Sequence, residues 1–223
     1  SVDGFVYMSE QVHSELRAYS DAPALFSPHP LFENFGERVE RSEACVRLGL
    51  DPANRYVLFF GLIRDYKGLD LLLDAWAQLR RAGRTEGRRL IVAGEFYTAR
   101  EPYLNRIADN GLQDEVLLHD RFIPDDDVKY YFSAADFVVQ PYKTATQSGV
   151  TQIAYQFCVP MVVTKVGGLA EIVPDGRVGY VCELTPEGVA GAIERMYEGD
   201  TLQRFRENCV EERRRFSWEE MCS

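Results

Sequence analysis

The chain has 223 residues, of which 46% are hydrophobic and 12% aromatic, with a formal net charge of -10 at pH 7. It can therefore bury a sizeable core, which excludes disordered, collagen-like and fibrous classes. The excess of negative charge repels nucleic acid and anionic lipid at long range, so we expect no nucleic-acid partner. Of the 25 cationic residues, 21 are Arg. The forked guanidinium suits phosphate and carboxylate, which leaves small anionic ligands open.

Five scattered cysteines without a C-x-x-C pair predict neither a disulfide framework nor a zinc site. A reducing, cytoplasmic compartment is expected. Residues 144–164 carry no charge, but their glutamines, Gly149 and Pro160 argue against a transmembrane segment. No signal peptide is visible at the start. Because the chain begins with Ser1, we expect a fragment of a longer protein.

Along the chain, residues 1–30 contain one strand-like run, a short helix over 9–19 and a connector around His29, which two prolines favour as extended. They do not fit the core that follows, and a family resemblance carried by later segments implies that they are the remnant of an N-terminal domain and an interdomain connector. Residues 31–199 alternate short apolar runs with segments of helical period, which predicts an α/β, Rossmann-like, doubly wound parallel sheet. From residue 200 to 223 a charged C-terminal helix is expected, cut short by the end of the chain. The predicted strands are 56–61, 89–93, 115–118, 136–140, 161–164 and 179–182, and the predicted helices are 69–79, 103–110, 125–134, 148–157 and 186–197.

The loop after the first of these strands places two cations close to the sheet edge where such folds bind ligands. Arg64 and Lys67 are three residues apart in a loop that runs from Gly61 to Gly68. Glycine permits a ligand to approach the backbone, and phosphate is normally held in such strand-to-helix turns. An isolated Arg-x-x-Lys is more simply a solvated loop. The position of this loop at the carboxyl edge of the sheet favours an anion site.

A second loop, after the strand 136–140, leads into a helix through hydroxyl residues and a glycine. Ser148 is the expected N-cap, and the amides of Gly149, Val150 and Thr151 would point from the helix start toward a phosphate. An ordinary capped helix is the alternative. The pair Gly167–Gly168 after the strand 161–164 is either a further tight turn near the ligand or a turn alone.

The segment after the strand 115–118 offers apolar groups for a planar base. Phe122 and Ile123 precede a run of aspartates at 125–127, and we place Val128 in the same site. The aspartates equally suit a helix start. The three histidines, His13, His29 and His119, are far apart, and each is interpreted as structural. No G-x-G-x-x-G, P-loop or G-x-S-x-G motif occurs.

Taken in order, four segments resemble the C-terminal, donor-binding half of a GT-B glycosyltransferase of the retaining family 4. They are residues 59–68, 92–95, 135–141 and 160–171. The resemblance implies that Arg64 and Lys67 bind the diphosphate of a nucleotide-sugar, UDP- or GDP-linked, and stabilise the leaving nucleotide. It also implies a hexosyltransferase that needs no cofactor and no metal.

The same resemblance implies that most of the acceptor-binding N-terminal half is missing. The acceptor, a sugar, a lipid or another small molecule, would bind through that half, as would any peripheral membrane contact. The fragment alone is expected to be inactive.

One departure from the family concerns two Glu residues with seven residues between them. Family members use the first near the sugar and the second at the ribose. Ala145 and Ile153 stand at these positions. Thr151 or Gln152 are the remaining candidates for the ribose. Two alternatives therefore stay open: a non-catalytic GT-B-like binding or assembly module, and a GT-B sugar-nucleotide epimerase.

Overall fold

The computed structural model describes residues 3–7, 10–26, 31 and 33–216. The first part is a small β–α–β unit, in which β1 (Phe5–Tyr7) and β2 (Ala24–Phe26) pair in parallel and α1 (Glu10–Arg17) connects them. Strand β2 was not predicted, because three residues are too short to give an alternating pattern. The connector around His29 lies outside the described residues.

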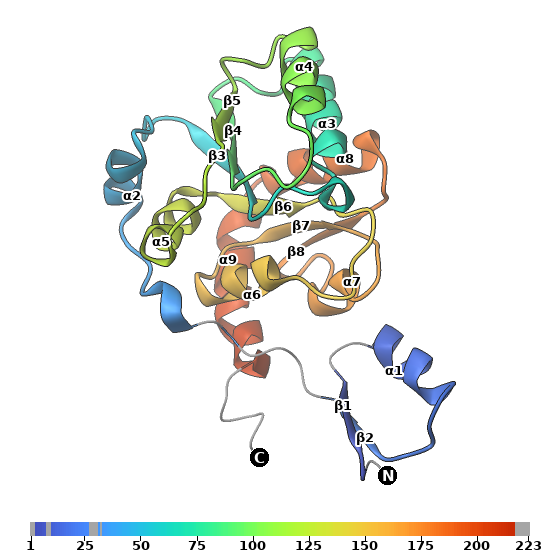
Figure 1. Cartoon of the computed structure of the whole chain (residues 1–223). Coiled ribbons are helices and arrows are strands. Elements are labelled where there is room, and N and C mark those ends of the chain that lie inside the picture. Colours follow the sequence, from blue (N-terminus) through green and yellow to red (C-terminus); the bar gives the residue numbers. More distant parts are fainter. Residues whose placement is uncertain (1–2, 8–9, 27–30, 32, 217–223) are drawn as a thin grey trace.

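The larger part is built on a six-stranded parallel sheet in the order β5-β4-β3-β6-β7-β8 (Figure 1). The chain adds β4 and β5 on one side of β3 and then returns to add β6, β7 and β8 on the other. This is the strand order of a doubly wound nucleotide-binding fold, so the predicted fold class is confirmed. All six predicted strands are present, with ends shifted by at most one residue. They are β3 (Arg55–Phe60), β4 (Arg88–Ala93), β5 (Val116–His119), β6 (Phe137–Gln140), β7 (Met161–Thr164) and β8 (Gly179–Cys182).

Helices cover both faces of this sheet, and the alternation of side chains along β3 shows why two cores form. Leu58 contributes to one hydrophobic cluster, and its neighbours Val57 and Phe59 contribute to the other. Helices α3, α4 and α8 pack on the Val57 side, and α2, α5 and α6 pack on the Leu58 side (Figure 1). The helices are α2 (Arg41–Leu48), α3 (Leu69–Arg81), α4 (Glu101–Asp109), α5 (Asp125–Ala134), α6 (Gly149–Gln156), α7 (Leu169–Ile172), α8 (Pro186–Met196) and α9 (Thr201–Glu212), with short 3-10 turns η1 (Glu33–Phe35), η2 (Asp65–Lys67) and η3 (Arg213–Phe216).

The terminal helix belongs structurally to this same unit as far as it is described. Phe205 of α9 joins one hydrophobic cluster, and Cys209 and Phe216 join the other. Residues 201–216 therefore pack on the sheet domain. Helix α2 was not predicted from sequence, because only Ala44 and Cys45 of its eight residues are buried.

The uncharged stretch 144–164 forms α6 and β7 inside the domain. Its polar side chains bond within the protein: the hydroxyl of Thr164 donates to the carbonyl of Tyr142 at 2.6 Å. The longest uncharged helix here, α6, has eight residues. Throughout the described ranges, no helix combines the length and the apolar character needed to cross a bilayer.

Candidate functional site

Strands β3 and β6 lie next to each other at the centre of the sheet, but the chain leaves them toward opposite sides. The crevice at their carboxyl ends is where open α/β folds bind ligands. The loop after β3 and the loop after β6 meet there. The N–H of Lys143 donates to the carbonyl of Tyr66 at 2.7 Å, and the rings of Tyr66 and Tyr142 lie 6.1 Å apart. The two loops selected from sequence thus form one site.

Two glycines allow this close approach. Gly68 has a φ of +70°, and a Cβ atom there would overlap with the carbonyl oxygen of Pro141. Gly61 has a φ of +97°, and a Cβ atom there would lie 3.1 Å from Lys67 Nζ and 3.5 Å from Val150 Cγ2. Gly61 therefore sits between the Lys67 ammonium and the first turn of α6, which brings these two groups together.

Lys67 is a partly buried cation without a counter-ion. In the described part of the chain, no carboxylate lies within ion-pair distance of Lys67 or of Arg64. Burial, and secondarily the charge of Arg64, lower the pKa of Lys67 to about 8. The exposed Arg64 places its guanidinium 5.2 Å from the ring centroid of Tyr97. A partly desolvated ammonium beside a second positive charge is stabilised by an anion.

The start of α6 supplies neutral donors to the same crevice. Ser148 occupies the predicted N-cap, although its hydroxyl shares a hydrogen bond of 3.3 Å with the hydroxyl of Tyr142 instead of capping the helix. The N–H groups of Gly149 and Val150 make no hydrogen bond with any described residue. The N–H of Thr151, which was expected to point toward a phosphate, instead donates to the Ser148 carbonyl at 3.2 Å. Two free N–H groups at a helix N-terminus favour a negative charge.

The side chains of Thr151 and Gln152 do not reach this crevice. Thr151 is fully buried, and its hydroxyl donates to Gln140 Oε1 at 3.1 Å. Gln152 is 1% exposed, and its Oε1 is buried without a hydrogen-bond partner. In this geometry neither side chain is exposed for the expected contact with a ribose, because the rotation of α6 about its axis turns both side chains inward.

An apolar pocket of about 170 Å³ opens beside Gly61. It brings together the residues proposed from sequence for a planar base, Phe122, Ile123 and Val128. Several other lining residues were not predicted for this pocket, among them Phe35 and Glu95. Glu95 directly follows β4 at the same sheet edge, which is the signal that could have identified it. The complete lining is Phe35, Phe60, Gly61, Leu62, Gly94, Glu95, Phe122, Ile123, Asp125 and Val128.

Hydrogen bonds from outside the loop hold the segment that carries Arg64 and Lys67. Asp65 Oδ1 accepts from the hydroxyls of Thr98 at 2.8 Å and Tyr103 at 3.0 Å, and these bonds lower the pKa of Asp65. Lys143, in the opposite loop, forms a 2.7 Å ion pair with Asp70 at the start of α3. These contacts fix the loops before any ligand arrives. Their partners are more than 30 positions apart in sequence, so no local pattern indicated them.

Ala145 and Ile153, which stand where family members have two Glu residues, lie in apolar surroundings. Ile153 is 7% exposed and packs in the hydrophobic cluster, and Ala145 lies against it. Burial lowers the pKa of His119, and its Nδ1 lies 2.8 Å from the Tyr131 hydroxyl. His13 stacks on Tyr7. Among the described residues, no three His, Cys, Asp or Glu side chains are grouped so that they could hold a metal ion.

Comparison with known proteins agrees with this architecture. The family model described as glycosyl transferases group 1 matches residues 54–199, and the chain belongs to that family. D-inositol 3-phosphate glycosyltransferase 2 of Catenulispora acidiphila is 32% identical over 98% of the chain. Sucrose-phosphate synthase from Thermosynechococcus elongatus is similar over 99% of the chain, with a TM-score of 0.84 and 21% identity. HepE of Anabaena, solved in complex with UDP, covers 99% with a TM-score of 0.81 and 20% identity.

The chain spans about half the length of these proteins: 53% of the Catenulispora protein, 56% of the synthase and 61% of HepE. The fold is that of the C-terminal half of a GT-B glycosyltransferase, which confirms the resemblance found in the sequence.

Proposed function

We propose that this chain is the part of a retaining, hexosyltransferase-type glycosyltransferase that binds the nucleotide-sugar donor. One observation carries the proposal: the Lys67 ammonium has no ion-pair partner among the described residues and lies beside Gly61, close to the N–H groups of Gly149 and Val150, which no described residue uses. Cations and helix N-termini at a glycine turn are what a diphosphate requires. The adjoining apolar pocket would take the base, with Phe122, Ile123 and Val128 against its faces.

Catalysis in this proposal comes from positioned positive charge. As the glycosidic bond to the donor sugar breaks, negative charge grows on the departing nucleotide diphosphate. Arg64, Lys67 and the α6 amides stand at the carboxyl edge of the sheet, and in this proposal they stabilise the transition state more than the ground state. We propose that these groups suffice without a divalent metal. The acceptor would bind through residues outside this chain.

Calorimetric titration with UDP, GDP and ADP, each with magnesium and with EDTA, tests the proposal. We expect uridine to be preferred, because HepE, a protein of the same fold, was solved with UDP. A nucleotide at a concentration of about 100 times its dissociation constant should add about 2.7 kcal/mol to the free energy of unfolding. Equal affinity with EDTA is expected. If none of the three nucleotides binds, the donor-binding proposal fails for this chain.

The pKa of Lys67 predicts how binding depends on pH. Free Lys67 loses its proton near pH 8, whereas a bound diphosphate holds the charged form. Above pH 8, binding must therefore take up a proton, and UDP affinity should fall by up to about tenfold per pH unit. Titrations at pH 8.5 in two buffers with different ionisation enthalpies should show uptake of about three quarters of a proton, because about a quarter of free Lys67 is still protonated half a pH unit above its pKa. The variant Lys67→Arg keeps its charge and should bind with a flat profile between pH 7.5 and 9.5. A flat profile in the unchanged protein would contradict the role of Lys67.

The apolar residues Ala145 and Ile153 favour one alternative, a binding module without transfer activity. Product analysis with the full-length protein and the preferred donor separates the candidates. Transfer of the sugar supports the glycosyltransferase, a changed donor sugar supports an epimerase, and binding without turnover supports the module.

A further inference from the structure

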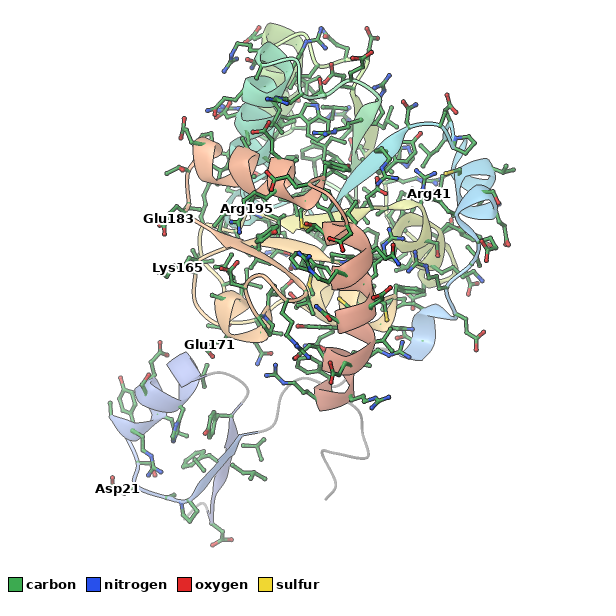
Figure 2. All side chains as sticks on the ribbon, turned by 180° about the vertical axis from the view of Figure 1, so that it is seen from behind. Asp21, Arg41, Lys165, Glu171, Glu183 and Arg195 are labelled. Atoms are coloured by element: carbon green, nitrogen blue, oxygen red, sulfur yellow. The ribbon has the colours of Figure 1, made fainter. Side chains whose placement is uncertain are left out.

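A second cavity, of about 370 Å³, lies at the amino-terminal edge of the sheet, opposite the crevice. Arg55 begins β3, and Asp136 immediately precedes β6, so both stand at that edge. Arg41, labelled in Figure 2, comes from the start of α2, and α9 supplies the remaining lining residues. The lining consists of Arg41, Arg55, Asp136, Leu202, Gln203, Arg206 and Glu207.

Positive charge dominates this cavity. Three guanidinium groups line it against two carboxylates, and Asp136 is the buried one. Asp136 Oδ2 is already engaged, since it accepts from the N–H of Tyr56 at 2.9 Å and lies 3.4 Å from Arg55 Nε. Burial, followed by the charge of nearby Arg38, lowers the pKa of Arg206. The single buried carboxylate therefore leaves the arginines only partly neutralised.

Backbone carbonyls occupy some of the arginine donors, but they carry no net charge. Arg206 Nη2 donates to the carbonyls of Ala135 at 3.0 Å and Asp136 at 3.3 Å. The Nε atoms of Arg41 and Arg206 are buried without a hydrogen-bond partner. In the described part of the chain, no hydrogen bond uses Nη1 or Nη2 of Arg55. Both Nη atoms of Arg41 donate to backbone carbonyls, of Pro52 and Asn54, so Arg55 is the arginine whose accessible donors a ligand in the cavity can take.

We propose that this cavity binds the phosphoryl group of a small anion, either free inorganic phosphate or a sugar phosphate. A phosphoryl group offers three oxygens and about two charges, which match several guanidinium forks better than one carboxylate does. The site is separate from the crevice, because the six residues of β3 place the two edges roughly 20 Å apart. An anion there would link α2, α9 and the amino ends of β3 and β6, and so stabilise the domain.

Thermal unfolding with orthophosphate and with glucose 6-phosphate tests this site, each compared with sodium chloride at equal ionic strength. We expect a saturable rise in Tm. Arg55→Gln should weaken the phosphate affinity about tenfold or more and still fold, because the Arg55 side chain is 53% exposed. The matched control is Arg84→Gln, which removes a 65% exposed arginine paired with Glu194 outside the cavity, and its affinity should not change.

A second control separates this site from the crevice. The double variant Arg64→Ala/Lys67→Met should keep its response to phosphate. A rise in Tm with glucose 6-phosphate as well as orthophosphate identifies the phosphoryl group as the ligand, and a rise with orthophosphate alone identifies the inorganic ion. The proposal is overturned if chloride stabilises equally, if Arg55→Gln responds like the unchanged protein, or if the double variant loses the response.

Discussion

The double variant Arg64→Ala/Lys67→Met should lose nucleotide diphosphate binding while keeping its fold. Each charged hydrogen bond to a phosphate contributes about 1.5–3 kcal/mol. Loss of both should lower the UDP affinity by about 10²- to 10⁴-fold, which calorimetry measures directly. Neither side chain has an ion-pair partner among the described residues, so no carboxylate is left unpaired.

Stability should move in the opposite direction from binding. Lys67 holds its proton up to about pH 10.5 when unfolded but only up to about pH 8 when folded. Its charge therefore destabilises the fold at neutral pH, a cost that is relieved as the pH rises from about 8 to 10.5. The ligand-free double variant should have an equal or higher Tm at pH 7. A charge that lowers stability but strengthens ligand binding is typical of a binding site and is not expected of a structural lysine.

Lys129→Met is the matched control, since Lys129 lies beside Tyr130 on α5 and does not line the crevice or its pocket. It should bind UDP like the unchanged protein. If the double variant binds UDP with unchanged affinity, the assignment of the crevice as the diphosphate site is wrong.

Gly68→Ala should destabilise the domain by about 3 kcal/mol and impair nucleotide binding together. Adopting the positive φ costs an alanine about 1–2 kcal/mol. The added Cβ would also overlap with the Pro141 carbonyl, which forces the loop that carries Lys67 away from the loop that leads to α6. In a domain of this size the Tm should fall by about 6–12 °C.

Gly83→Ala separates the cost of the positive φ from the cost of the overlap with the Pro141 carbonyl. Gly83 has a φ of +69°, nearly that of Gly68, but no atom lies within 4 Å of a Cβ built there. This control should cost only the φ contribution, about 1–2 kcal/mol or about 2–8 °C in Tm, and leave UDP affinity unchanged. Equal losses in the two variants would show that the close approach of the two loops is unimportant.

Much of the fold followed from local pattern. The helix 125–134 begins and ends at the predicted residues, and each strand lies within one residue of its prediction. The failures have a common cause: β2 is only three residues long, and α2 buries only Ala44 and Cys45, so neither produces a periodic signal.

The crevice was predictable for a different reason. In a parallel sheet every carboxyl end lies at the same edge, so the order of strands along the chain already brings the loops with Lys67 and Ser148 to one side. That the two loops lie in direct contact follows from the position of β3 beside β6, which the alternation of strands and helices does not specify. The strand order is a tertiary result.

By itself, the sequence therefore determined the class of sheet and the edge at which the loops with Lys67 and Ser148 stand, because these depend on local periodicity and on chain direction. Only the tertiary structure decided that Thr151 and Gln152 face inward, that Phe35 and Glu95 line the apolar pocket beside Gly61 and that Arg55 and Arg206 share a cavity. These facts depend on the rotation of a helix about its axis and on contacts between residues far apart in the chain. Neither leaves a local pattern in the sequence, because side-chain burial is fixed only when the elements pack together.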